Sequence, residues 1–199
     1  ENLATEDKWI LSKFNKLASD VTENLEKFEL GLAVQKLYDF IWDVYCDWYI
    51  EISKARLNSG DEAQKNTAKA VLVYVLSETL KLLHPFMPFI TEEIWQTLPH
   101  SGETIMRAKW PEYSRKLSFE YEESSFEKLM TVIKAIRTRR SEMNVAPSKK
   151  AKVYLATADA EIFRNGVKYI EKLASASEVE IGSEFDIEGA VTVVTDCAV

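Results

Sequence analysis

Hydrophobic and polar positions follow a helical period through the first two thirds of the chain. The first apolar series steps by three and four residues: Ile10, Phe14, Leu17, Val21, Leu25 and Phe28. This spacing predicts one apolar face of an amphipathic helix. Residues 29–57 carry two such stripes, one beginning at Leu30 and one at Tyr38. A helix that is apolar on two sides is expected to be buried between neighbours.

Turn and breaker residues divide this helical region. Asn58-Ser59-Gly60 ends the second helix, and a third helix over 61–83 is apolar on nearly all sides from Ala68 onward. Prolines after His84 and Met87 break that helix. A short helix follows from Thr91, and then residues 99–121 form a connection without clear periodicity.

A further helix begins near Ser124, where Ser124 and Glu127 match a capping box, and it ends at 144–147. After Pro147 the pattern changes to strand-like alternation at 152–157, an amphipathic helix at 159–174, and short strands at 179–181 and 190–194. The sequence therefore predicts a mainly α fold. Residues 1–146 form an antiparallel helical bundle, and 147–199 form a small α/β subdomain, which is too small to be expected to fold alone.

Composition fits a folded domain without a membrane segment. Of the 199 residues, 46% are hydrophobic and 29% are charged, and no apolar run reaches the roughly 18 residues of a membrane span. The first residues are polar and do not resemble a signal peptide. Two cysteines far apart indicate neither a disulfide framework nor a metal site. We therefore expect a cytoplasmic protein.

Charge is concentrated in residues 128–152, KLMTVIKAIRTRRSEMNVAPSKKAK. Eight basic residues and one acid, Glu142, give this stretch a net charge of +7, whereas the whole chain carries −7. A local excess of this size favours contact with a polyanion. Arg140 shares the apolar face of the predicted helix with Ile133 and Ile136, so it must find a partner, either an acid of the bundle or a ligand phosphate or base edge. For Arg139 the alternative is a solvated surface charge.

Candidate catalytic chemistry is sparse. The sequence contains no glycine-rich phosphate loop, no HExxH and no Gly-x-Ser-x-Gly. The isolated His84 is expected to lie at a helix end. Asp43, Asp47 and Glu51 follow at intervals of four along one helix edge; they suit either a cation or, as we favour, a solvated edge. A stand-alone enzyme with an acid-pair site is disfavoured, because no acid, base and binding loop converge.

Four segments together carry a family resemblance. They are DKWILSKFN, YDFIWDVYCDWYIEISK, LLHPFMPFITEEIWQ and IKAIRTRRSEMNVAPSKKA, which begin at Asp7, Tyr38, Leu82 and Ile133. In wording, order and spacing they resemble the bacterial valyl-tRNA synthetase family of class I synthetases. The resemblance covers the chain to about residue 151, and the remainder fits the family's small α/β unit.

The resemblance implies an anticodon-binding bundle that follows a catalytic core in the same polypeptide and precedes a coiled-coil arm. The implied partner is the anticodon stem-loop of valine tRNA, and the implied enzyme is a monomer that attaches valine to tRNA with ATP and Mg. The family's two ATP-site signatures do not occur here, and the editing domain is also absent, so the chain is expected to be inactive alone and to hold no cofactor. Valine anticodons end in A-C, and RNA sequence is read mainly in splayed, single-stranded loops.

Seven residues are the resulting candidates for tRNA binding. Arg137 and Arg140 match the family pattern, lysines would hold phosphates, and Asn144 would read a base. The candidates are Lys134, Arg137, Arg139, Arg140, Asn144, Lys149 and Lys150. Candidates for stacking on bases are Trp110, Phe119 and Tyr121, which are equally suited to a core. The chain departs from the family wording at Thr138, Arg139 and Ala146.

The alternative function is a structural or docking module. In that case the bundle supports the catalytic core through its broad aromatic surface and makes little contact with RNA. An isolated chain would then expose an apolar patch and associate with itself.

Overall fold

The computed structural model describes residues 3–146 and 148–199, which divide into two compact units. Unit 1 is Glu1–Glu123 and unit 2 is Ser124–Val199. The sequence places the end of the bundle at residue 146, whereas the division into compact units falls after residue 123. The domain boundary at 146/147 stays a prediction, and Pro147 itself lies outside the described residues. The structure confirms the predicted fold class, because it is mainly helical with one small sheet.

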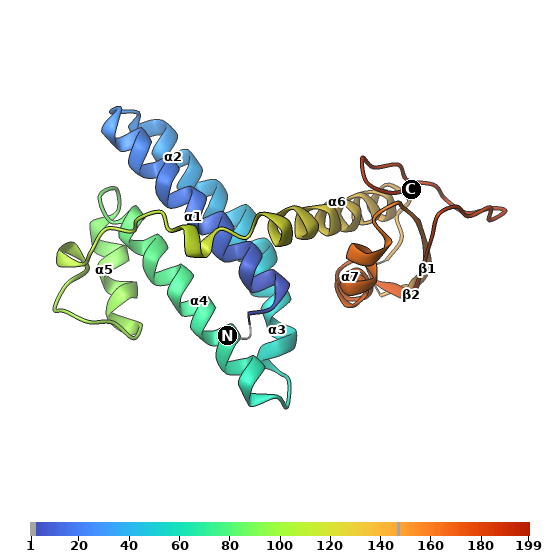
Figure 1. The fold of residues 1–199 in the computed structure, drawn as a ribbon, viewed down its shortest axis with the longest axis horizontal. Coiled ribbons are helices and arrows are strands. Elements are labelled where there is room, and N and C mark those ends of the chain that lie inside the picture. Colours follow the sequence, from blue (N-terminus) through green and yellow to red (C-terminus); the bar gives the residue numbers. More distant parts are fainter. Residues whose placement is uncertain (1–2, 147) are drawn as a thin grey trace. The chain divides into compact units, whose positions relative to one another are not determined.

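Unit 1 is built on three antiparallel helical segments. Helix α1 (Thr5–Glu26) runs away from the amino terminus, the second segment returns, and α4 (Glu62–Leu83) runs back alongside both (Figure 1). The predicted stripe faces the core from Ile10 to Val21, where Ile10, Phe14 and Val21 are at most 2% exposed, but its last member, Phe28, lies beyond the end of α1 and is 88% exposed. Asp61 begins α4 because its side chain accepts hydrogen bonds from the backbone amides of Ala63 and Gln64.

The second segment changes its helix type along its length. It comprises α2 (Leu30–Asp39), a π-helical stretch η1 (Phe40–Ile50) and α3 (Glu51–Leu57), without a break between them. The wider turns of a π-helix change which side chains share a face. Tyr45, Trp48 and Tyr49 are buried, whereas Tyr38 and Trp42 are about half exposed. The prediction that this helix is buried on both apolar sides is therefore wrong for its first half.

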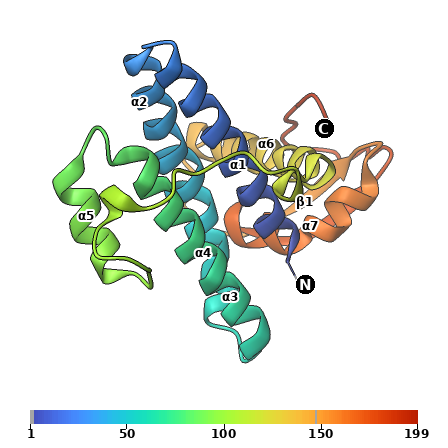
Figure 2. The same ribbon diagram turned by 60° about the vertical axis from the view of Figure 1, so that its left-hand side comes forward.

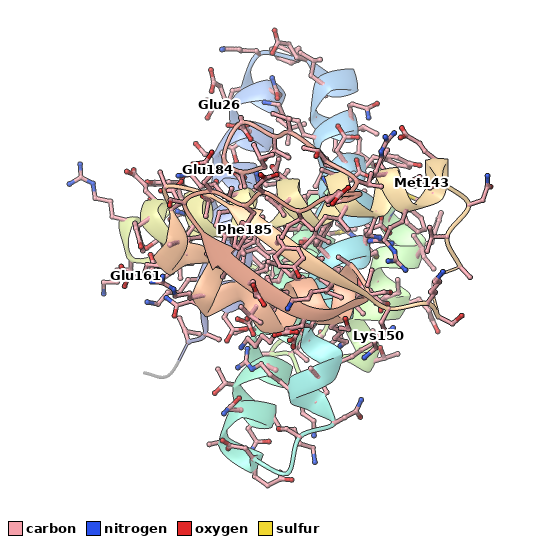
Figure 3. All side chains as sticks on the ribbon, turned by 90° about the vertical axis from the view of Figure 1, so that its right-hand side faces the viewer. Glu26, Met143, Lys150, Glu161, Glu184 and Phe185 are labelled. Atoms are coloured by element: carbon pink, nitrogen blue, oxygen red, sulfur yellow. The ribbon has the colours of Figure 1, made fainter. Side chains whose placement is uncertain are left out.

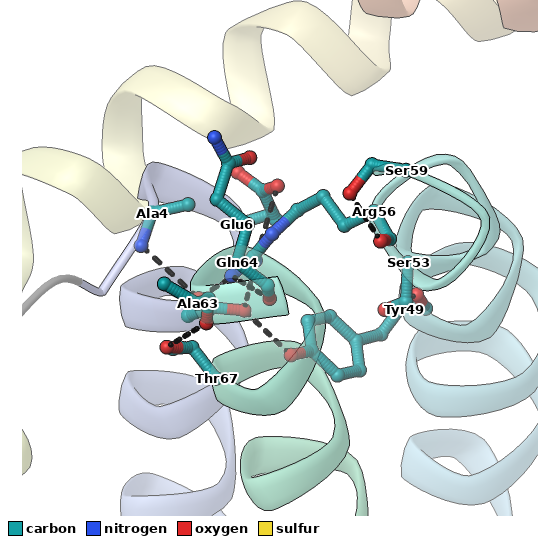
Figure 4. A network of polar contacts seen from close by, with 10 residues as sticks. Ala4, Glu6, Tyr49, Ser53, Arg56, Ser59, Ala63, Gln64 and Thr67 are labelled. Carbon is teal, nitrogen blue, oxygen red and sulfur yellow. Dashed lines mark hydrogen bonds and ion pairs between the residues drawn. The ribbon is translucent and has the colours of Figure 1, made fainter. Parts of the chain in front are cut away.

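A buried ion cluster joins α1 to α3 in unit 1. Arg56 Nη1 lies 2.7 Å from both carboxylate oxygens of Asp7, and the Tyr49 hydroxyl donates a hydrogen bond to Asp7 Oδ1 at 2.6 Å (Figure 4). Glu6 Oε1 lies 3.4 Å from the same guanidinium nitrogen. Burial alone would lower the pKa of Arg56, but its hydrogen bonds and the negative charges of Asp7 and Glu6 raise it above its ordinary value.

Unit 1 continues through α5 (Pro88–Thr97) and two short 3-10 turns, η2 (Ile105–Arg107) and η3 (Arg115–Leu117). The packing of α5 against α4 is visible in Figure 2. Helix α5 begins at Pro88, earlier than the predicted start at Thr91, because proline is well suited to the first turn. Thr91 is instead buried, and its hydroxyl lies 2.7 Å from His84 Nδ1 at the end of α4.

Helix α6 (Glu120–Glu142) starts in unit 1 and forms the first element of unit 2. It begins before the predicted capping box at Ser124, and Glu122 and Glu123 in its first turn are tied to α1. Glu122 pairs with Lys8, and Glu123 accepts a 2.6 Å hydrogen bond from Ser12. The hydrogen bond from Lys8 lowers the pKa of Glu122.

The rest of unit 2 is a parallel two-stranded sheet with a crossover helix. Strand β1 (Ala151–Ala156) pairs with β2 (Ala176–Gly182), and α7 (Ala160–Leu173) connects them. Gly166 of α7 lies so close to the Leu129 side chain that a Cβ there would approach within 2.2 Å. The strand predicted at 190–194 is wrong, since within the described residues this segment pairs with no strand and Val194 is 74% exposed. No helix in the part of the chain that the structure describes is long and apolar enough to cross a membrane.

Candidate nucleic-acid interface

The carboxyl end of α6 is closed by a well-defined turn. Asn144 has a φ of 54°, in the left-handed region, its amide donates to Ser141 O at 3.0 Å, and the amide of Val145 donates to Arg140 O at 2.9 Å. These bonds form the Schellman arrangement, which favours Gly or Asn at the left-handed position. The sequence predicted Asn144 as a base reader; the structure shows that it also has a local conformational role.

Arg140 ties the segment after this turn back to α6. Its Nη2 donates to the backbone carbonyl of Lys149 and, at 3.3 Å, to that of Ala146. The predicted need for a partner is thus met by backbone carbonyl groups. The sequence had indicated an acid of the bundle or a ligand phosphate or base edge instead. Because these carbonyls are neutral, the guanidinium keeps its positive charge at the surface.

The seven predicted residues all lie on α6 or on the segment between α6 and β1. Arg140 is partly buried, and the other six are exposed. Arg139 pairs with Glu142 at 3.1 Å on the surface of α6, where both side chains are about half exposed. An exposed pair of this kind contributes little to stability and leaves the Arg available to a stronger anion.

Three of the seven residues line one cavity of about 640 Å³ in unit 2. They are Arg139, Arg140 and Lys149, and they are accompanied by apolar side chains such as Ile136 of α6 and Met143, which follows the end of α6. Figure 3 shows Met143 and Lys150 at the same end of unit 2. Lys134, Arg137, Asn144 and Lys150 do not line this cavity. The combination of cationic and apolar lining suits a nucleotide, which has a phosphate and a flat base.

The cavity also contains residues that the sequence did not indicate as part of a site. Tyr154 of β1 packs against Phe185 with ring centroids 5.3 Å apart, and Lys152 lies over the Tyr154 ring. Lys152 is bound by Glu180 and Glu178, whose hydrogen bonds raise its pKa. Lys152 was visible as part of the basic stretch, but its acidic partners on β2 depend on strand register and could not be identified from the charge pattern.

The candidate stacking aromatics belong to unit 1. Trp110 is partly buried and donates its indole N–H to Thr22 Oγ1 at 2.8 Å, which is a structural role. Phe119 lies under Lys8, and Tyr121 is 68% exposed. Within residues 3–146 and 148–199, no three His, Cys, Asp or Glu side chains lie close enough together to hold a metal ion. The three acids Asp43, Asp47 and Glu51 therefore do not form such a group.

Comparisons with a family model and with curated proteins both find tRNA ligases. The family model of the anticodon-binding domain of tRNA ligase matches residues 7–155, more than half of the chain. The chain is 50% identical over 192 residues to a valine–tRNA ligase of Clostridium tetani and 44% identical over 197 residues to one of Staphylococcus epidermidis. These alignments cover 95% and 97% of the chain but only 22% of each relative. The chain therefore spans about a fifth of the length of the curated relatives it matches.

Proposed function

The chain belongs to the family of anticodon-binding domains of tRNA ligases, and from this premise we propose that it recognises the anticodon stem-loop of valine tRNA. Its place would be within a valine–tRNA ligase, where binding of the anticodon supports ATP-dependent attachment of valine by a catalytic core in the same polypeptide. We expect that enzyme to use ATP and Mg, to be a monomer and to work in the cytoplasm. The chain alone is expected to be inactive.

The observation that carries this proposal is the cationic end of α6. A net charge of +7 over 128–152 lies in a chain of net charge −7, and Arg140 fixes the backbone that carries Lys149 and Lys150. A pre-ordered segment loses less conformational entropy when it binds, so more of the electrostatic attraction contributes to affinity.

The seven residues divide into two roles. Lys134, Lys149 and Lys150 would contact phosphates, which position the RNA without reading its sequence. Arg137, Arg140 and Asn144 would lie near base edges, which carry the sequence information. Arg139 would contact RNA after releasing Glu142.

A salt-series binding titration tests this proposal. The chain would be titrated with a valine anticodon stem-loop and with the same loop whose A-C bases have been changed. We expect tighter binding to the valine loop and a logarithmic salt slope of about −0.7 for each phosphate bound in single-stranded RNA. Equal binding to both loops would remove sequence reading from the proposal, and a slope near zero would remove the cationic contact.

A docking module is the second candidate, and one observation favours it. Four apolar residues along one side of the second helical segment are between 40% and 57% exposed: Leu30, Val34, Tyr38 and Trp42, which we term the α2 surface stripe. Exposed apolar patches of this kind usually mark an interaction surface. The catalytic core of the same polypeptide would be the partner, and this is compatible with RNA binding by unit 2.

A further inference from the structure

A second concentration of positive charge lies in unit 1, in a cavity that none of the seven candidate residues lines. This cavity has a volume of about 860 Å³ and lies between α4 and the segment that follows α5. Its charged lining residues are four bases and one acid: Lys69, Lys81, Arg107, Lys109 and Glu78. Unit 1 as a whole has 14 Lys and Arg against 21 Asp and Glu, so this cavity has the opposite charge balance from its unit.

One wall is a row of side chains on α4. Lys69, Val73, Ser77 and Lys81 recur at intervals of four residues, which places them along one side of the helix. The two lysines are separated by about 18 Å along the helix axis, at about 1.5 Å per residue. The row therefore presents two ammonium groups with a hydroxyl and an apolar side chain between them.

The opposite wall is held in a fixed conformation by Glu92 of α5. Glu92 accepts hydrogen bonds from Thr104 Oγ1 at 2.7 Å and from the Ile105 amide at 3.1 Å. Gln96 donates to the Glu103 carbonyl at 2.8 Å. These bonds fix the start of η2, and η2 ends at Arg107, whose side chain lines the cavity. The conformation of the cationic wall is therefore fixed by hydrogen bonds within the chain.

The bases of the cavity are only partly neutralised. Lys81 pairs with Glu78, and Lys109 pairs with Glu112 at 3.2 Å, where both side chains are strongly exposed. For Lys69 and Arg107 the described part of the chain shows no ion pair. These two exposed cations lie on opposite walls, and they would attract an anion between them.

Trp95 supplies an independent observation at the same place. This residue lines the cavity and is 2% exposed, and its indole Nε1 has no hydrogen-bond acceptor among the residues that the structure describes. The His100 ring, itself exposed, packs on the indole with centroids 4.0 Å apart. A buried donor without an acceptor is costly, and the resonance of this N–H reports on changes in the cavity that Trp95 lines.

We propose that this cavity is a phosphate-binding site and that the RNA backbone supplies the phosphate. The identity of the RNA rests on the proposed function, but the contact itself is independent of sequence. Lys69 and Arg107 would bind phosphate oxygens from the two walls, and Ser77 would donate a further hydrogen bond. Unit 1 would then hold the backbone of the RNA whose loop is read by unit 2.

The test combines binding and a local signal. The variant Lys69→Ala/Arg107→Ala would be compared with Arg115→Ala/Lys116→Ala, which removes the same charge from unit 1 outside the cavity. Both would be titrated with the valine anticodon stem-loop and with a complete valine tRNA transcript in a salt series. In parallel, the Trp95 indole N–H resonance, assigned with Trp95→Phe, would be followed during titrations with the transcript and with inorganic phosphate.

We expect the cavity variant to bind the transcript about tenfold more weakly, with a salt slope smaller by about 0.7, which corresponds to one phosphate that is no longer bound. The control pair should differ much less, and the transcript should move the Trp95 signal at lower concentration than inorganic phosphate does. The proposal is overturned if the two pairs bind alike, or if phosphate alone moves Trp95 and the transcript does not. Loss of discrimination between the two stem-loops contradicts the proposed function instead, since backbone binding needs no sequence preference.

Discussion

Asn144 has an observed conformational role and a predicted role in RNA binding, and a single substitution separates the two. Its left-handed backbone conformation ends α6, and its side chain was predicted to read a base. Asn144→Gly keeps the backbone conformation available and removes the amide. We expect Asn144→Gly to melt within a few degrees of the parent chain and to lose preference for the valine loop.

The matched variant is Asn144→Val, because a β-branched residue is strained at positive φ. We expect it to lower the free energy of unfolding by about 1–2 kcal/mol, measured by chemical denaturation. If Asn144→Gly keeps the full loop preference, the side chain has only the conformational role.

Arg140 illustrates what the sequence could and could not predict at the scale of one residue. Periodicity placed it on the apolar side of a helix, and from this it followed that the guanidinium needs a partner. The partners are the carbonyls of Ala146 and Lys149. Their positions depend on the path of the turn after Asn144, and helical spacing carries no information about that path.

At the scale of elements, the buried ion cluster is the strongest polar link between α1 and α3. Replacing Arg56 with Met would leave the carboxylates of Glu6 and Asp7 buried, each at most 1% exposed, without their cation. Removing one partner of a buried pair costs about 3–5 kcal/mol. We expect a loss of that size in the free energy of unfolding, measured by urea denaturation.

Lys54→Met is the control on the same helix. Lys54 pairs with Glu51 at the surface, where both side chains are about half exposed, so its removal should cost at most about 1 kcal/mol. Equal losses for Arg56→Met and Lys54→Met would contradict the assigned role of the cluster.

Glu92 makes the order of the segment after α5 dependent on pH. Hydrogen bonds from Gln96, then from Thr104 and the Ile105 amide, lower its pKa below the ordinary value of 4.5. A lowered pKa means that the carboxylate stabilises the fold above the unfolded value and that this stabilisation is lost as pH falls through the folded value. We expect amide hydrogen exchange at 103–107 to become faster as pH falls below the ordinary carboxyl value of 4.5 and through the lowered folded value, after correction for the intrinsic rate.

Glu92→Gln should show the faster exchange already at pH 7, because a neutral amide is a weaker acceptor than a carboxylate. Glu93→Gln is the neighbouring control, since Glu93 is exposed and carries no such bonds to the residues that the structure describes. Unchanged protection in Glu92→Gln would show that the segment is fixed by other contacts.

The sequence predicted helices well and their surroundings less well. Long periodic segments identified α1, α4, α6 and α7, because an amphipathic helix repeats its signal over several turns. The π-helical stretch η1 was not predicted, since a change of hydrogen-bond register leaves the same residue types in place. The predicted strand at 190–194 failed because alternation shows strand propensity, whereas a strand also needs a neighbour with which to pair.

At the scale of the whole molecule, charge is divided unevenly between the units. Unit 1 carries a net charge of −7, whereas the 11 acids of unit 2 are balanced by 11 bases. Because the acids of unit 2 lie largely outside 128–152, the basic stretch stands out within a neutral unit. The fold class, the family and the basic stretch were accessible from the sequence. The cavities were not, because their walls come from residues far apart along the chain.

The two candidate functions predict different responses to salt, and this allows them to be separated in the intact chain. Anticodon binding should weaken as salt rises, while the chain remains monomeric in analytical ultracentrifugation at every salt concentration. Salt-independent self-association without RNA binding is the result expected of a docking module, because apolar contacts are not screened. In that case Tyr38→Ser/Trp42→Ser, in the α2 surface stripe, should abolish the association.

The control is the exposed pair Tyr113→Ser/Tyr121→Ser, which should leave the association unchanged. If the chain binds RNA with a steep salt slope and stays monomeric, the α2 surface stripe remains free to meet the catalytic core, and both surfaces would serve one enzyme.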